Sequence, residues 1–170
     1  MIEQEFLKIS ANDLLQFSSR IEDCLGRLNY DQIWTRNSKN ENAVGNLVLH
    51  LCGNMRQWIV SGVGEKPDVR DRDSEFAASG GIQPAELAAL LKSTIAEAVE
   101  IIGNLPPAQL LDKKTIQKHY DVTVMEAIYH VVEHFAQHTA QIIFATKLMT
   151  GQDLGYYRYL NPPAHKEAES

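Results

Sequence analysis

The sequence predicts an all-α protein, a four-helix bundle whose helices are joined by two long connections. Three observations support this prediction. Apolar residues recur at helical spacings in four separate segments. Capping residues, prolines or glycines bound these segments, and alternating patterns typical of strands are scarce. We expect the 170 residues to form a single domain, residues 1–170, with a hydrophobic core of its own.

The first two expected helices lie in the N-terminal part of the chain. The first runs from about Glu3 to Leu28, and its apolar stripe comprises Phe6, Leu7, Leu14, Phe17, Ile21, Leu25 and Leu28. The second runs from about Val44 to Val60, with Asn42 as its candidate N-cap and Gly62 and Gly64 beyond its end. Its middle, NLVLHLCGNM, is apolar nearly all round, which predicts burial on most sides.

The other two helices follow the long connections. Residues 64–81 form a polar, charged connection, and a helix begins after it near Pro84, where proline suits the first turn. A second connection, with a short extended piece around residues 114–120, precedes the last helix. Thr123 and Glu126 form a capping-box pattern there, and the helix continues to about Met149, with Gly151 beyond it. The tail from about residue 160 is expected to be loose.

Composition excludes several kinds of function. The formal net charge is −6 and no basic run of five or more residues occurs, which argues against nucleic-acid binding. No apolar run is long enough to span a membrane, and the N-terminus has no signal-peptide pattern. Cys24 and Cys52 are the two cysteines and form no CxxC motif, so we expect reduced thiols and a cytoplasmic protein, although a disulfide between them stays open.

Three histidines of the last helix stand four residues apart, in YHVVEHFAQHTAQI. At about 100° per residue, His134 and His138 fall on the apolar stripe and point into the bundle, whereas His130 falls at its edge. Imidazoles at positions i and i+4 are neighbours and can bind one ion. A solvated histidine strip, or hydrogen bonds to polar neighbours, would also explain the pattern.

A third ligand should come from another helix, and His50 is the one histidine inside another expected helix. On its own helical wheel, however, His50 lies about 115° from the centre of the apolar stripe. It shares that side with Asn54 and Gln57, so the pattern fits either a polar cavity or a surface strip.

Two long stretches, HLCGNMRQWIVSGVGEKPDVRDRDSEF and EHFAQHTAQIIFATKL, resemble the DinB/YfiT-like superfamily of metal-dependent four-helix-bundle proteins. The resemblance extends from the first helix to GYYRYL. It implies an up-down-down-up bundle and a metal site formed by His50, His134 and His138. An arginine common in that family after the last histidine is absent, because Thr139 and Ala140 follow His138. The finer substrate assignment therefore stays open.

The resemblance also implies a function. It suggests a homodimeric, metal-dependent enzyme that transfers a low-molecular-weight thiol to a small-molecule substrate. A metal-dependent hydrolase and a non-catalytic dimeric metal-binding bundle are the alternatives. Zinc or nickel is the first expectation for the divalent ion, and iron or manganese is possible. Asn54 and Gln141 are candidates to orient a ligand or contact substrate.

Overall fold

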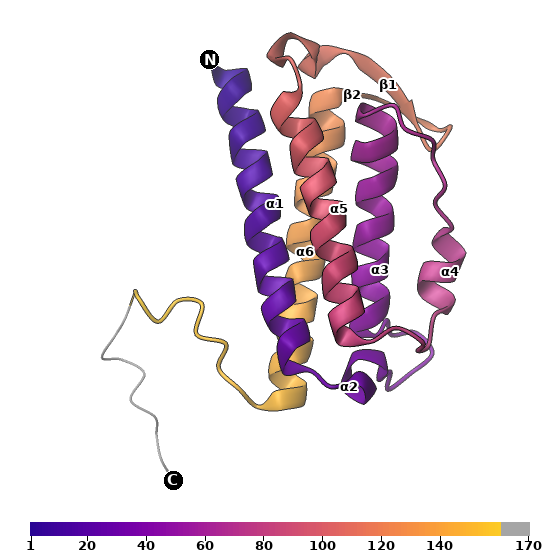
Figure 1. The fold of residues 1–170 in the computed structure, drawn as a ribbon, viewed down its shortest axis with the longest axis vertical. Coiled ribbons are helices and arrows are strands. Elements are labelled where there is room, and N and C mark those ends of the chain that lie inside the picture. Colours follow the sequence, from indigo (N-terminus) through magenta and orange to yellow (C-terminus); the bar gives the residue numbers. More distant parts are fainter. Residues whose placement is uncertain (161–170) are drawn as a thin grey trace.

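Four long helices form the body of the structure, a computed structural model that describes residues 1–160 (Figure 1). They are α1 (Ile2–Arg27), α3 (Val44–Met55), α5 (Pro84–Asn104) and α6 (Val124–Thr150). The predicted all-α bundle is confirmed. The tail from about residue 160, which was expected to be loose, lies outside the described residues, and so does His165 within it.

The helices run in the up-down-down-up order that the resemblance implied. In Figure 1, α1 and α6 descend, whereas α3 and α5 rise. Helix α1 packs against α5 and α6, and α3 packs against the same two helices. Because α3 and α5 are parallel, the chain must return along the full length of the bundle between them. This return explains the long connection after residue 64.

Helix ends follow the expected local chemistry with one exception. Thr123 accepts a hydrogen bond from the Glu126 amide, and the Glu126 carboxylate accepts one from the Thr123 amide, so the capping box is present. Gly151 ends α6 with φ of 67°, a left-handed conformation that glycine adopts at low cost. The prediction of Asn42 as an N-cap was wrong. Ala43 occupies that position, and its amide donates to the buried Asn46 side chain instead.

Helix α3 widens into a π-helix, η1 (Arg56–Val63), nearly two turns beyond His50. π-Helical turns are rare and are frequent at functional sites. The widening changes which side chains of η1 face the bundle. Trp58, Ile59, Val60 and Val63 of this segment are buried.

The connection that returns along the bundle, residues 64–83, is called the return connection. It carries a short helix, α4 (Arg72–Ala77), beside α3 (Figure 1). The buried Asn46 side chain of α3 donates to the carbonyls of Glu75 and Ala78 at 2.9 and 2.7 Å. Arg36 adds hydrogen bonds to the Phe76 and Ala78 carbonyls. These contacts fix α4 against α3, which places the connection next to the candidate site.

Two smaller features complete the connections. A one-turn helix, α2 (Tyr30–Trp34), follows α1. After α5, a 3₁₀ helix, η2 (Pro107–Leu111), leads into an antiparallel hairpin of β1 (Lys113–Ile116) and β2 (Tyr120–Thr123). The hairpin packs on η1 at the end of the bundle where α6 begins. The expected extended piece around residues 114–120 is thus a two-stranded hairpin.

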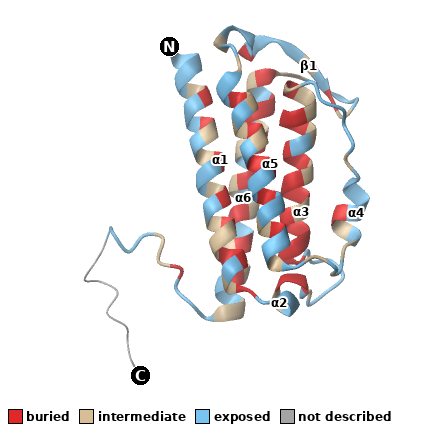
Figure 2. Ribbon diagram, viewed as in Figure 1, coloured by how far each residue is buried: buried red, intermediate tan, exposed pale blue. Residues whose placement is uncertain are grey.

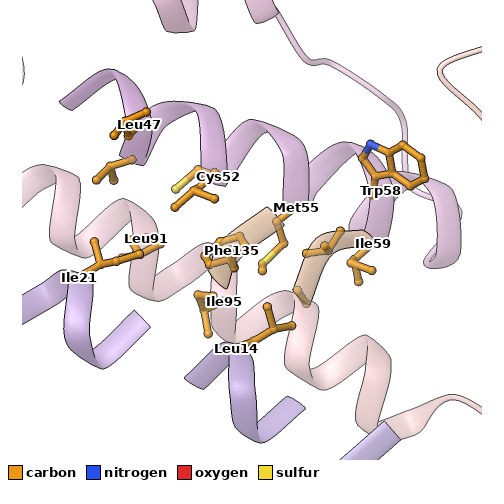
Figure 3. Close-up of a cluster of buried hydrophobic side chains, with 14 of the residues drawn as sticks. Leu14, Ile21, Leu47, Cys52, Met55, Trp58, Ile59, Leu91, Ile95 and Phe135 are labelled. Carbon is orange, nitrogen blue, oxygen red and sulfur yellow. The ribbon is translucent and has the colours of Figure 1, made fainter. Parts of the chain in front are cut away.

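The core lies between the inner faces of the four helices, where buried residues concentrate (Figure 2). Figure 3 shows side chains from all four helices meeting there, including Leu14, Ile21, Leu47, Met55, Leu91, Ile95 and Phe135. In α3, ten of the residues from Val44 to Met55 are buried, as the sequence predicted for this helix. Among residues 1–160, none of the helices has the length and apolarity needed to cross a membrane.

Candidate metal centre

Three histidines from two helices meet inside the bundle. His50 comes from α3, and His134 and His138 come from successive turns of α6. One ring nitrogen from each lies within 4.8 Å of the others, and the Nε2 atoms of His50 and His134 are 2.9 Å apart. Their ring centroids are 4.5 to 5.3 Å apart. The structure therefore brings together all three residues that the sequence and the resemblance indicated.

The donor set fits a divalent metal ion. Nitrogens that share one zinc ion at bonds of ~2.0–2.1 Å lie roughly 3–3.5 Å apart. The Nε2 atoms of His50 and His134 are close to this spacing at 2.9 Å, and the nitrogen of His138 lies within 4.8 Å of them. Two unprotonated imidazole Nε2 atoms 2.9 Å apart would repel each other through their lone pairs. The distance therefore requires a proton or a metal cation between them. A cation bound to both nitrogens would satisfy them in the buried interior.

The electrostatic environment keeps the two α6 ligands neutral, the form that binds metals. Burial, together with the charges of the neighbouring histidines and of Arg70, lowers the pKa of His134 to about 3. Burial also lowers the pKa of His138, although its hydrogen bond to Gln141 acts in the opposite direction. Both rings are therefore uncharged at neutral pH.

A charged pair from the return connection holds His50. The Nδ1 atom of His50 is 3.0 Å from Oε2 of Glu75, a residue of α4 that is 8% exposed. Arg70 donates to both carboxylate oxygens of Glu75, at 2.7 and 2.8 Å. Burial alone would raise the pKa of Glu75, but hydrogen bonds and charges from Arg70 and His50 bring it below its usual value. Glu75 is therefore an anion.

The carboxylate of Glu75 fixes the tautomer of His50. Nε2 of His50 faces His134 and must be unprotonated to bind a metal, so the proton belongs on Nδ1. Nδ1–H then donates to Glu75, an arrangement that orients the ring and raises its basicity as a ligand. Arg70 Nη2, 3.1 Å from the same nitrogen, donates to Glu75 in this tautomer.

A glycine makes room for this charged pair. Gly53 lies one turn beyond His50 on α3, and a Cβ atom there would overlap Oε1 of Glu75 and touch Nε of Arg70. A glycine inside a helix costs about 1 kcal/mol relative to alanine. The close approach of Glu75 gives that glycine a structural reason.

Of the two predicted supporting residues, Gln141 contacts a candidate ligand and Asn54 contacts the neighbouring His130 instead. Gln141 accepts a hydrogen bond at its Oε1 from Nδ1 of His138, at 2.8 Å. This contact orients the His138 ring with Nε2 toward the other ligands. Asn54 is buried, and its Nδ2 lies 3.4 Å from Nε2 of His130. Its Oδ1 has no hydrogen-bond partner within the described chain.

Within residues 1–160, the other histidines stay outside the cluster. His130 stacks on Trp58, with ring centroids 4.0 Å apart, and lies parallel to His134 at 5.6 Å. His119 is exposed on the hairpin turn. His130 therefore forms part of the surroundings of the centre, as its position at the edge of the apolar stripe suggested.

A cavity of about 610 Å³ opens beside the cluster. Its lining includes His50, His134, Asn54, Trp58, His130, Arg70, Arg72, Gln117, Tyr120, Val122 and Glu126. A second cavity, about 650 Å³, lies between α3, the return connection and α5, and includes Arg70 and Glu75 but none of the three histidines. The first cavity gives a small molecule access to the candidate metal ligands.

Glu75 and Arg70 are the site residues that sequence reasoning missed. The sequence indicated a polar, charged connection at residues 64–81 but did not connect it with His50. The helical Gly53, one turn from a histidine inside an apolar helix, was a signal of close approach by another segment. It did not say which segment approaches.

Comparisons with solved structures agree with this architecture. A conserved protein from Enterococcus faecalis is 17% identical, with a TM-score of 0.69 over 85% of this chain and 97% of that chain. A DinB-like protein from Bacillus cereus is 13% identical, with a TM-score of 0.63 over 80% of this chain and 90% of that chain. No curated protein sequence matches.

The fold and the histidine cluster define an all-α bundle of the DinB-like class, so the resemblance noted in the sequence is confirmed. The family model described as "Protein of unknown function (DUF1572)" matches residues 1–161. The chain belongs to this family, which lies within the DinB-like group.

Proposed function

We propose that this protein is a metal-dependent enzyme that uses a three-histidine centre to transfer a low-molecular-weight thiol. The observation that carries the proposal is the convergence of His50, His134 and His138 next to a cavity of about 610 Å³. Three protein ligands leave a coordination position open, as in catalytic rather than structural metal sites. Zinc or nickel is our first choice of ion, ahead of iron or manganese.

Bound in this way, a divalent ion favours ionisation of a thiol or water in the open position and so supplies a nucleophile near neutral pH. The protein's own residues do the rest. Glu75 and Gln141 orient two of the ligand rings through contacts with their Nδ1 atoms. In a thiol transfer, sulfur forms a bond to an electrophilic carbon. The leaving group departs with the electron pair of the broken bond, and the thiol proton passes to solvent.

Metal analysis tests the ligand set. We expect about one divalent ion per chain in the purified wild type, and loss of that ion in His134→Ala without loss of helix content, because His134 is a half-buried ligand on a long helix. Elemental analysis and circular dichroism measure these two quantities. His119→Ala, which removes an exposed histidine from the hairpin turn, is the matched control and should keep its metal. Metal retained in His134→Ala would contradict the proposal.

Two alternatives share the same scaffold. A hydrolase would use water in the open position, and a screen of thiols with electrophiles against simple esters and amides separates the two reactions. A non-catalytic dimeric metal-binding bundle would bind the ion but turn over none of these substrates. We also propose a homodimer, supported by the neighbouring exposed apolar side chains Phe144 and Leu148 on α6, and light scattering measures its mass.

The proposed location is the cytoplasm. Both cysteines, Cys24 and Cys52, are free and buried. Reduced thiols are usual in that compartment.

A further inference from the structure

The cavity beside the metal centre continues into a mouth with unpaired positive charge. A smaller cavity of about 270 Å³ shares Arg70, Arg72 and Gln117 with it, so the two adjoin. Within residues 1–160, no carboxylate lies at ion-pair distance from Arg72 or Lys118, which both line this mouth. Arg72 is exposed, and its guanidinium lies over the Phe76 ring at 4.8 Å.

The other charged groups around these cavities already have partners. Arg70 is paired with Glu75. Asp68 accepts hydrogen bonds from the Gln57 side chain and the Arg70 amide. Glu126 accepts hydrogen bonds from the Thr123 amide and hydroxyl in the capping box. Asp68 and Glu126 keep their negative charge, because these hydrogen-bond donors are uncharged. Arg72 and Lys118 are the basic side chains of the mouth that have no ion-pair partner among residues 1–160.

The hairpin turn that carries Lys118 is strained. Gln117 and Lys118 have φ of 55° and 61°, a left-handed conformation that costs a non-glycine residue about 1 kcal/mol or more. The Gln117 side chain donates to Gln57 of η1, which also accepts from Arg70. These bonds hold the strained turn over the cavity. Strain of this kind is concentrated at ligand-binding positions.

The inner wall of the cavity contains polar atoms without partners. Asn54 Oδ1 and Trp58 Nε1 are buried and make no hydrogen bond within the described chain. They offer one acceptor and one donor in a wall of stacked rings, Trp58 on His130 and Tyr120 near Trp58. Both atoms lie beneath the solvent-accessible surface, so a ligand or water in the cavity reaches them only when the side chains around them move.

We propose that Arg72, with Lys118, binds the carboxylate of a small thiol acid whose sulfur reaches the metal centre. This inference rests on the proposed function and names its substrate class, anionic rather than neutral thiols. Arg72 is the main specificity residue because its planar guanidinium can bind a carboxylate through two parallel hydrogen bonds. Lys118 adds a second positive charge across the mouth.

The test uses the cobalt-substituted protein, in which thiolate binding gives a near-ultraviolet charge-transfer band. Mercaptosuccinate, which carries two carboxylates, is titrated against the neutral thioglycerol. We expect Arg72→Gln to weaken mercaptosuccinate binding by about fivefold and to leave thioglycerol binding unchanged, because a partly exposed ion pair contributes up to ~1 kcal/mol. Arg72→Lys, which keeps the positive charge, should lose less affinity for mercaptosuccinate than Arg72→Gln. Equal losses for both thiols, or none for mercaptosuccinate, would overturn the proposal.

Arg20→Gln is the matched control, since Arg20 of α1 also places its guanidinium over an aromatic ring, that of Tyr156 at 5.4 Å. It should change neither affinity. If neither thiol gives the band in wild type, the proposed thiol function fails, and calorimetry with succinate on the metal-free protein decides the anion site separately. Succinate binding that Arg72→Gln weakens supports the anion site, and its absence in wild type overturns it.

Discussion

His50 differs from the other two histidines of the centre because a charged pair from outside the bundle binds its ring. Glu75 and Arg70 belong to the return connection, whereas Gln141, the partner of His138, lies on the same helix as its histidine. A carboxylate on the remote nitrogen increases the electron density of a ligand ring more than an amide does. His50 is therefore expected to form the strongest bond to a metal.

Replacing the carboxylate tests this role. We expect Glu75→Gln to weaken zinc binding by about tenfold to 100-fold, because the amide keeps the shape of the side chain but loses its charge. Competition with a chromogenic chelator measures the affinity. Glu97→Gln is the control, since Glu97 also receives two basic side chains, Arg56 and Lys66, but does not contact a histidine. Equal zinc affinity in wild type and Glu75→Gln would mean that Glu75 serves only to anchor α4.

Individual side chains differed in how far the sequence could predict them. The apolar stripe of α6 placed His134 and His138 correctly toward the interior, because that helix has one buried face. Glu75 could not be found in this way. Its position depends on the hydrogen bonds that hold α4 to α3, and these join residues about thirty positions apart in the sequence.

Among the helices, α3 is the one for which a helical wheel misleads. The bundle covers one side and the return connection covers another, so apolar residues occur all round and no single stripe exists. The π-helical turns of η1 also break the period of about 100° per residue that the wheel assumed for the C-terminal part of this expected helix. The family resemblance therefore indicated His50 where periodicity did not.

Gly53 gives a test of how α3 accommodates the connection. Glycine to alanine in a helix normally stabilises a protein by ~0.5–1 kcal/mol. We expect Gly53→Ala to destabilise instead, by about 1 kcal/mol or more, because the added methyl group overlaps the Glu75 carboxylate. It should also weaken metal binding. Denaturant unfolding measures the free energy.

Gly26→Ala provides the comparison, since no atom lies within 4 Å of a Cβ added there on α1. This variant should show the ordinary stabilisation. A stabilised Gly53→Ala with unchanged metal affinity would show that Glu75 can move aside without cost.

The helix boundaries were largely predictable because they depend on local chemistry. Pro84, the Thr123 capping box and Gly151 each determine a helix end through their own backbone or side-chain preferences. The Asn42 prediction failed because the buried Asn46 supplies the capping oxygen from inside the helix. The order of helix directions came from the resemblance, since composition carries no information on packing direction.

For the chain as a whole, packing protects both thiols. Burial raises the pKa of Cys52 to about 12, and Cys24 is fully buried with its sulfur 3.6 Å from the Tyr156 hydroxyl. We expect neither thiol to react with a disulfide reagent at pH 8 until the protein unfolds, because the thiolate is the reactive form. Thiol labelling and circular dichroism are measured over the same series of denaturant concentrations. Labelling should begin at the concentration at which helix content is lost.

The same shift has a defined effect on stability. An unfolded cysteine ionises near pH 8.5, whereas Cys52 in the folded state does not. The contribution of the protonated Cys52 thiol to the free energy of unfolding is therefore complete below about pH 8.5. It is lost as the pH rises toward 12. Rapid labelling of Cys52 in the native protein would instead show that the reagent enters the cavity that this residue lines.

Two kinds of structure supply the groups of the centre, the bundle helices and the return connection. Rigid helices set where the three imidazoles stand, while a surface segment, which tolerates sequence change better than a helical core, supplies the anion that tunes one of them. Evolution could thus alter the Lewis acidity of a bound ion by editing this segment alone. Relatives that keep the bundle but vary the segment are expected to show different chemistries on one conserved geometry.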